Sequence, residues 1–406
     1  MKDMKDMNDI SLSIHMHDSW YFRDGRNHNG STQVAASSQL FPSQRTILGA
    51  LMALLKEEIK TDDPHYHRLF KAPWGNAAPL RISPLRLQYK KDTYVPAPRL
   101  IVECLSEQAR QKHYECLQPT GTSYTADFGR LHELKLSSND EYVHRPLWMK
   151  DSVILSNEMP ENSILDLTNL LTHETRLGIA LNAKNKQAET GQLYLTEHIR
   201  PQEDEFAFSV SLFFAPELQE CKEKLCQRLN SGAWVRFGAE GRLAYITQDK
   251  SYCPPSFSVP PSRLFVASLL SPLSTNVVTS ESASGPHQWL AEQVKACFPD
   301  GELLNLLADK PRPIGGWQNY RDTAGAVDSL HYFDAGSCAL IRFAQPQQFD
   351  DVTEQLELCQ NKQQARCSNT QLNYGSIPGH YFLGAHANQQ HYGYGHYMLL
   401  PLEDKK

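Results

Sequence analysis

A proline-rich stretch separates two parts of this chain that repeat the same order of predicted elements. Residues 253–261 contain four prolines, which is typical of a linker between folded units. On each side of it, the hydrophobic pattern predicts strand, helix, strand, strand, helix and strand. This is the order of a split βαβ unit, in which two helices cover one face of a four-stranded sheet. The sequence therefore predicts an α+β chain of two ferredoxin-like (RRM-like, βαββαβ) domains, residues 9–252 and 262–406.

The first predicted domain opens with an alternating strand and a capped helix. Leu12, Ile14 and Met16 alternate with polar residues, so one face of this strand is expected to be buried. Ser43 is expected to cap the helix that follows, where apolar residues recur at helical spacing. The remaining elements are predicted as strands over 176–181, 192–199, 206–214 and 234–246, with a helix from residue 216.

The second predicted domain follows the same scheme. Its strands are predicted around residues 264–270, 313–318, 336–343 and 381–400, and its helices over 289–298 and 349–359. Because 406 residues exceed what one ordinary core needs, extra sequence is expected somewhere. Residues 61–169, with frequent proline and tyrosine and only short apolar runs, are interpreted as a large irregular insertion in the first domain.

Composition narrows the class of protein. The formal net charge is −6, which disfavours a protein that grips long duplex nucleic acid alone but allows a pocket for a few nucleotides. No segment has the roughly 18 uninterrupted apolar residues of a membrane span, and residues 1–10 lack the apolar core of a secretory signal. The nine cysteines are scattered without a Cys-x-x-Cys pair, which favours reduced thiols in a cytoplasmic protein.

No familiar catalytic or metal-binding motif is present. The chain lacks a phosphate-binding Gly-x-x-x-x-Gly-Lys loop, a His-Glu-x-x-His zinc motif and a Gly-x-Ser-x-Gly nucleophile elbow. His386, His391 and His396 recur at five-residue spacing, but no cysteine or carboxylate partner is evident beside them. We therefore expect no metal and no cofactor.

Several short motifs, in order along the chain, carry a family resemblance. They are DSWYFRDGR at 18–26, FPSQRTILGAL at 41–51, RLGIAL at 176–181, ETGQLY at 189–194, TEHIR at 196–200, GAEGR at 238–242, GGW at 315–317 and DAGS at 334–337. Together they resemble the third Cmr subunit of type III-B CRISPR effector complexes, a member of the RAMP superfamily. Little is recognised in 61–169, and Asp334 stands where that family more often has proline.

This resemblance implies a subunit that is not an enzyme. Family members bind the 5′ repeat-derived handle of the crRNA and sit at the foot of the complex. They contact the large polymerase-like Cmr subunit and the first backbone Cmr subunit, and they meet the target RNA only indirectly. The target-cutting nuclease is the backbone subunit. The implied role is RNA-guided antiviral defence in the cytoplasm.

The residues in these motifs suit phosphate recognition. Arginine side chains and helix starts are frequent phosphate ligands, and glycine lets a backbone approach closely. The candidate RNA-binding residues are Arg23, Gly25, Arg26, Ser43, Gln44, Arg45, Arg176, Lys184, Lys186, His198, Arg200, Gly238, Gly241 and Arg242. Structural readings compete: an ion pair at Arg23–Asp24, a plain helix cap at Ser43, and strand bulges at the glycines.

Besides the handle-binding subunit, two functional alternatives remain open from the sequence. Ser13, His15 and His17 lie on the polar side of the first strand, where they face either RNA or solvent and partner protein. A crRNA-processing endoribonuclease of the same superfamily needs a general acid and base, and His15, His17 or His198 with a nearby tyrosine are candidates. A scaffold that never touches RNA is the third possibility.

Overall fold

The computed structural model describes most of the chain. The described residues are 9–23, 38–71, 79–105, 112–138, 140–160, 162–181, 185, 187–252, 259–275, 285–318, 325–356, 380–382 and 394–402. The chain is a mixed α+β protein in which strands predominate. Within these ranges no helix is long and apolar enough to cross a membrane.

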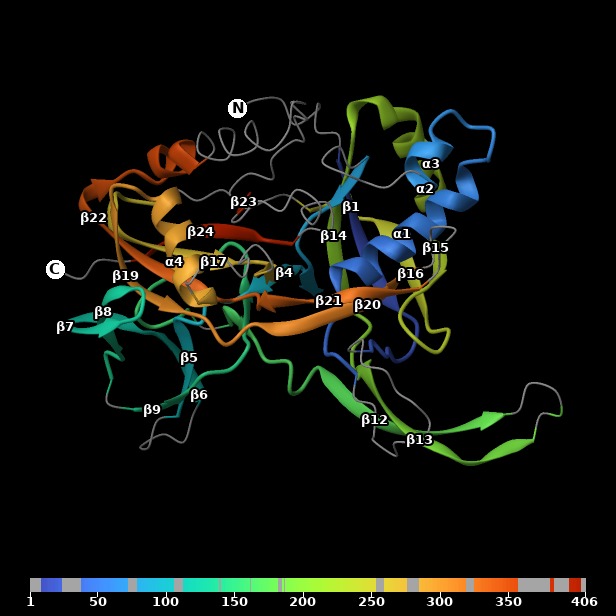
Figure 1. The fold of residues 1–406 in the computed structure, drawn as a ribbon, viewed down its shortest axis with the longest axis horizontal. Helices are drawn as coiled ribbons and strands as arrows, with labels where there is room; N and C mark the ends of the chain where they lie inside the picture. Colours follow the sequence, from blue (N-terminus) through green and yellow to red (C-terminus); the bar gives the residue numbers. More distant parts are fainter. Residues whose placement is uncertain are drawn as a thin grey trace.

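The first half is built on a nine-stranded antiparallel sheet (Figure 1). The strands follow the order β11-β10-β4-β3-β14-β1-β16-β15, and β2 also pairs with β14. Their bounds are β1 Asp9–Met16, β2 Leu80–Ile82, β3 Arg86–Tyr89, β4 Asp92–Pro96, β10 Trp148–Lys150, β11 Ile164–Leu165, β14 Phe206–Phe214, β15 Ala233–Arg236 and β16 Leu243–Gln248. Helices α1 (Gln44–Glu58), α2 (Tyr66–Phe70) and α3 (Gln219–Leu229), with a 3-10 turn at Pro216–Leu218, accompany it.

The register of the central pair explains why these segments form a sheet. In β1 and β14, Leu12 lies opposite Val210 and Ser13 lies opposite Ser209. Apolar residues on one face therefore pack together with the apolar stripes of α1 and α3 in one core. The predicted helix cap is confirmed, because Ser43 Oγ accepts a hydrogen bond from the Thr46 amide at 3.2 Å.

The opposite, polar face of this sheet is covered at its centre. Ser13 is only 8% exposed and donates to Gln88 at 2.6 Å. Arg86 is 1% exposed and donates to Ser209 and Ser211 at 3.2 and 3.1 Å. The expectation that the polar side of the first strand is open therefore fails at Ser13, whereas His17 at the strand's end is exposed.

The second half repeats this strand arrangement in a smaller sheet. Its order is β19-β22-β17-β24-β23, all antiparallel. The first four strands match β3-β14-β1-β16 of the first half. The bounds are β17 Ser262–Leu269, β19 Gly301–Leu307, β22 Cys338–Gln347, β23 His380–Phe382 and β24 His396–Leu402. Helix α4 (Pro286–Cys297) and a helical segment at 349–356 pack on it.

The expectation of an irregular insertion is wrong. Residues 61–169 contain regular β structure, and β2, β3, β4, β10 and β11 belong to the main sheet. The others form a three-stranded sheet of β5 (Ile101–Leu105), β6 (Lys112–Cys116) and β9 (Glu141–Val143), and a hairpin of β7 (Gln118–Ala126) and β8 (Gly129–Lys135). Strands β5, β6 and β9 have three to five residues, and the longer β7 and β8 are poorly buried, so none has the long apolar alternation that identifies a strand in sequence.

The predicted strand neighbours are also wrong in both halves. The predicted strands at 176–181 and 192–199 form a separate hairpin, β12 (Leu171–Leu181) and β13 (Ala188–Pro201), that projects from the body (Figure 1). The strand beside β14 is instead β3. Similarly, β20 (Arg312–Gln318) is not part of the second sheet but pairs with β21 (Gly325–Phe333). Strand β21 also pairs with β18 (Leu273–Ser274). The strand beside β22 is instead β19, which was not predicted.

The 61–169 region packs against both halves. A shared core joins Val102 of β5 and Met149 of β10 to Val266 of β17 and Leu400 of β24. Arg99 adds an ion pair to Asp309 at 2.6 Å. This region is therefore a bridge between the halves rather than an appendage of the first one.

Candidate functional site

The base of the β12–β13 hairpin is fastened to the segment that follows β1. The backbone of Trp20 exchanges two hydrogen bonds with Ile199 of β13, at 2.7 and 3.0 Å. The Trp20 indole is fully buried and donates to the carbonyl of Leu40 at 3.0 Å. The residues next to Trp20 are thereby held against the polar face of the hairpin base.

A tight turn between β15 and β16 approaches the same segment. Gly238 has φ +89°, and a Cβ there would lie 2.8 Å from the carbonyl oxygen of Tyr21. Ala239 donates its amide to that same oxygen at 2.9 Å. Only glycine permits this close approach with a left-handed backbone, and the turn brings Glu240 and Arg242 to the hairpin base.

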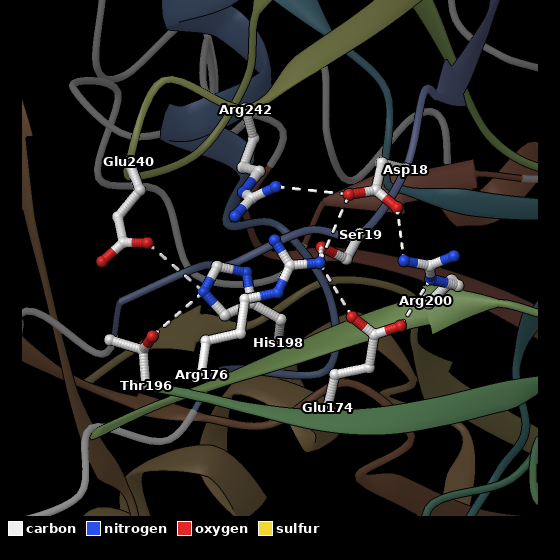
Figure 2. A network of polar contacts seen from close by, with 9 residues as sticks. All are labelled: Asp18, Ser19, Glu174, Arg176, Thr196, His198, Arg200, Glu240 and Arg242. Carbon is white, nitrogen blue, oxygen red and sulfur yellow. Dashed lines mark hydrogen bonds and ion pairs between the residues drawn. The ribbon is translucent and has the colours of Figure 1, made fainter. Parts of the chain in front are cut away.

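Asp18 lies at the centre of the resulting network (Figure 2). Its carboxylate contacts Arg200 at 2.7 Å, Arg176 at 3.3 Å and Arg242 at 3.4 Å. Burial alone would raise the pKa of Asp18, but the hydrogen bond from Arg176 and the charge of Arg200 outweigh it and lower that pKa. Asp18 is therefore a shared anion for three arginines from three different elements.

Glu174, on strand β12 of the hairpin, is the second carboxylate that contacts the arginines. It contacts Arg176 at 2.8 Å and Arg200 at 2.6 Å. The hydrogen bond from Arg176 lowers the pKa of Glu174 despite partial burial. The same bond raises the pKa of the Arg176 guanidinium. The two arginines are thus each held by two carboxylates.

His198 is the fully buried residue of the network. Its side chain is fully buried, contacts Glu240 at 3.3 Å and Thr196 at 3.1 Å, and stacks on Tyr21 with ring centroids 5.1 Å apart. Burial, and then the charges of Arg242 and Arg176, lower the pKa of His198. A neutral, enclosed imidazole of this kind positions its neighbours and does not reach an external ligand.

The network is balanced in charge. It contains three arginines and three carboxylates: Asp18 and Glu174 pair with the arginines, and Glu240 contacts His198. The side-chain exposure differs, however: 46% for Arg200, 31% for Arg176 and 20% for Arg242. Arg200 is consequently the guanidinium in this group most accessible to an external phosphate.

The structure brings four of the predicted site residues together. Arg176, His198, Arg200 and Arg242 converge, and Gly238 and Gly241 shape the adjoining turn. Gly25, Arg26, Lys184 and Lys186 lie outside the described residues.

The remaining predicted residues lie near the start of α1 or just after Phe22. Arg23 is exposed and Arg45 is half-buried. Ser43 serves as the helix cap. Gln44 is 4% exposed and donates to the carbonyl of Ser83 at 3.0 Å, so its side chain is committed to the fold.

The carboxylate and hydroxyl residues of the network were not predicted from the sequence. Asp18, Ser19, Glu174, Thr196 and Glu240 all contact a predicted residue, yet none was proposed as part of the site. A signal did exist, because Glu174 and Arg176 alternate on β12, and Thr196, His198 and Arg200 alternate on β13. Since Arg176 lies opposite Thr196 and Glu174 opposite His198, alternation places these side chains on one face.

The network contains three carboxylates and a histidine, but Asp18 and Glu174 are occupied by ion pairs with arginines. Within the described ranges, one group of side chains is close enough to hold a metal ion, and it lies in the β5–β6 pair. It is treated separately below.

Comparison with known proteins identifies the class of this chain as CRISPR-associated. The model of the family described as "CRISPR-associated protein (Cas_Cmr3)" matches residues 12–401. The chain belongs to the Cas_Cmr3 family, as the motif resemblance predicted. No curated protein matches the sequence.

Similar chains also occur among solved structures. One, in a cryo-EM structure of the type III-B Cmr-beta bound to cognate target RNA, is 13% identical, with a TM-score of 0.43 over 81% of this chain and 86% of that chain. Another, from the apo state of type III-B Cmr-beta, is 11% identical, with a TM-score of 0.30 over 60% of this chain and 98% of that chain.

Proposed function

We propose that this chain is a non-catalytic subunit of a type III-B Cmr ribonucleoprotein that binds the 5′ handle of crRNA in RNA-guided defence. In this proposal it joins the large polymerase-like subunit to the first backbone subunit, and it acts in the cytoplasm. The observation that carries the proposal is the convergence of four family-motif side chains, Arg176, His198, Arg200 and Arg242, at the base of one projecting hairpin.

We further infer that each half, 9–252 and 262–406, is a ferredoxin-like unit. The order β3-β14-β1-β16, with α1 after β1 and α3 after β14, supports this for the first half. The order β19-β22-β17-β24, with α4 after β17, supports it for the second. Repetition of one unit gives the protein two similar surfaces, and the handle is proposed to contact the first.

The handle is proposed to bind exposed arginines in the network or close to it in sequence. Arg23 is exposed four residues after Ser19, which itself accepts a hydrogen bond from Arg176. Arg200 is the most accessible guanidinium of the network. A phosphate can replace a carboxylate as the partner of an arginine with little change in geometry, because both accept paired hydrogen bonds. Asp18 and Glu174 would thus preorganise Arg200 until RNA binds.

The endoribonuclease alternative is disfavoured at one of its candidate bases. His198 stacks on Tyr21 and so has a tyrosine beside it, but it is fully buried. A general base has to come within hydrogen-bonding reach of the proton it removes. His15 and His17 remain testable by a direct assay for cleavage.

The experiment is a binding and cleavage assay with labelled crRNA that carries or lacks its 5′ handle. The chain is tested alone and together with the large and backbone subunits. Substitution of Arg23 and Arg26 by alanine is expected to weaken handle-dependent binding. Each lost phosphate contact should reduce the slope of log affinity against log salt by about 0.7, the value for single strands. The matched control is Arg263→Ala, an exposed arginine on β17.

The outcomes separate the three hypotheses. Handle-dependent binding of intact RNA that Arg23→Ala/Arg26→Ala weakens and Arg263→Ala preserves supports the proposal. Metal-independent cutting of a repeat RNA by the chain alone would transfer the function to crRNA processing. Assembly of a complex whose crRNA content and salt dependence are unchanged in the double variant would leave a scaffold that does not touch the handle.

A further inference from the structure

The β5–β6 pair carries a cluster of three metal-binding side chains. Cys104 on β5 lies directly opposite His113 on β6. Because side chains alternate along a strand, Glu115, two residues beyond His113, points to the same face. One ligand atom from each of the three lies within 4.8 Å of the others. The sheet register therefore brings a sulfur, a ring nitrogen and a carboxylate oxygen to one place.

Glu115 supplies an independent indication that something is bound there. This residue is 6% exposed, and its Oε1 atom contacts His113 Nε2 at 3.0 Å. Its Oε2 atom is buried and has no hydrogen-bond partner among the described residues. Buried polar atoms in proteins are almost always paired, since an unpaired one costs its full desolvation energy. A cation at this oxygen would remove that cost.

Asp140 is a fourth candidate ligand, beside the group of three. Asp140 directly precedes β9, which pairs with β5 so that Tyr142 lies opposite Cys104. Asp140 Oδ2 is 3.5 Å from His113 Nε2, the atom that Glu115 also contacts. Asp140 and His113 are 26% and 28% exposed, which gives a metal ion a path from solvent.

We propose that Cys104, His113, Glu115 and Asp140 form a structural zinc site. The mixture of one sulfur, one nitrogen and two oxygens suits Zn²⁺, whereas Mg²⁺ and Ca²⁺ prefer oxygen ligands alone. Four protein ligands complete a tetrahedral shell, as is typical of structural zinc sites. The proposed site lies in a different sheet from the arginine network.

Zinc would fix the most exposed strand of this small sheet. All three residues of β9 are exposed, whereas Val102 and Cys104 of β5 are fully buried in the core that joins the two halves. Bonds from Asp140 to the same ion as Cys104 would tie β9 to that core. Because zinc binds the thiolate form of cysteine, its binding displaces the Cys104 thiol proton, which passes to solvent.

The test uses Co²⁺ as a spectroscopic probe on the full chain after treatment with a chelator. Wild-type protein is expected to bind one equivalent of Co²⁺ with the near-ultraviolet charge-transfer band of a cobalt–thiolate bond, and Zn²⁺ should abolish that band. Cys104→Ser should remove the band. His113→Gln should weaken Co²⁺ binding by roughly tenfold or more, at least as much as loss of an outer-shell partner does.

Matched controls keep the result interpretable. Cys226→Ser changes a partly buried thiol on α3, and His173→Gln changes an exposed histidine on β12. Both variants should retain the band. Because His113 is partly exposed, its variant should fold, and Zn²⁺ should raise the thermal midpoint of wild type but not of His113→Gln. Absence of a thiolate band in wild type, or a Co²⁺ affinity unchanged in His113→Gln, would overturn the site.

Discussion

The sharpest consequence of the arginine network concerns Asp18. The substitution Asp18→Asn keeps the shape of the side chain but removes the charge that Arg176, Arg200 and Arg242 share. Glu174 then faces Arg176 and Arg200 alone. We expect the base of the β12–β13 hairpin to loosen.

The magnitude follows from the exposure of the groups. An exposed ion pair contributes about 0.2–1 kcal/mol, because water screens the charges. Asp18 is 37% exposed, so values toward the lower end apply to each of its three pairs. Together they give a loss of roughly 1–2 kcal/mol in the free energy of opening the hairpin base, on that scale.

The assay is hydrogen exchange of the backbone amides of Trp20 and Ile199, which bond to each other's carbonyls. A loss of about 1.4 kcal/mol corresponds to tenfold faster exchange when opening limits protection. Asp204→Asn is the matched control, since this exposed carboxylate lies in the loop before β14. A double-mutant cycle of Asp18→Asn with Arg200→Gln isolates the energy of their pair.

Equal exchange in Asp18→Asn and Asp204→Asn would refute the structural role of the network. So would additivity of the Asp18 and Arg200 changes, because contacting residues should couple. Faster exchange confined to the hairpin base, with a coupling energy of about 0.5 kcal/mol or more, supports it.

Three further outcomes are expected. Because the pKa values of Asp18 and Glu174 are lowered in the folded chain, the stability they contribute is present above their unfolded pKa values. This stability is lost as the pH falls through the pKa values of the folded chain. In urea unfolding between pH 3 and pH 6, roughly the range around the free carboxyl pKa values, the free energies of unfolding of the wild-type and Asp18→Asn proteins should therefore converge at the acidic end. Gly238→Ala should destabilise by at least about 1–2 kcal/mol, since a left-handed residue and a Cβ 2.8 Å from the Tyr21 carbonyl oxygen are both unfavourable; equal thermal midpoints would contradict this. Gly49→Ala on α1, where an added Cβ meets nothing within 4 Å beyond its chain neighbours and the helix's own backbone, should instead stabilise by about 0.5–1 kcal/mol in the same measurement.

Local sequence patterns predicted the individual elements well where apolar periodicity was strong. The alternation in β1, the apolar run of β14 and the cap at Ser43 all correspond to observed features. Short strands such as β3, with four residues, gave no usable period. The region 61–169 was therefore misread as irregular, because most of its strands have two to five residues and the longer β7 and β8, with nine and seven residues, are poorly buried.

The candidate site shows the same division. The arginines and glycines of the motifs were found because their residue types suit phosphate binding. Their carboxylate partners were overlooked, because the contacts join residues far apart in sequence. Arg176 and Arg242 reach Asp18 across 158 and 224 positions, and no local pattern contains such a pairing.

The sequence by itself determined which segments are strands and helices in the two sheet centres, and to which family the chain belongs. Tertiary structure decided that β3 rather than β12 lies beside β14, and that the motif arginines are held by Asp18 and Glu174. The physical reason is range. Periodicity and capping act within a few residues, whereas strand partners and ion pairs are selected by the packing of the whole chain, in which many registers satisfy the same local pattern.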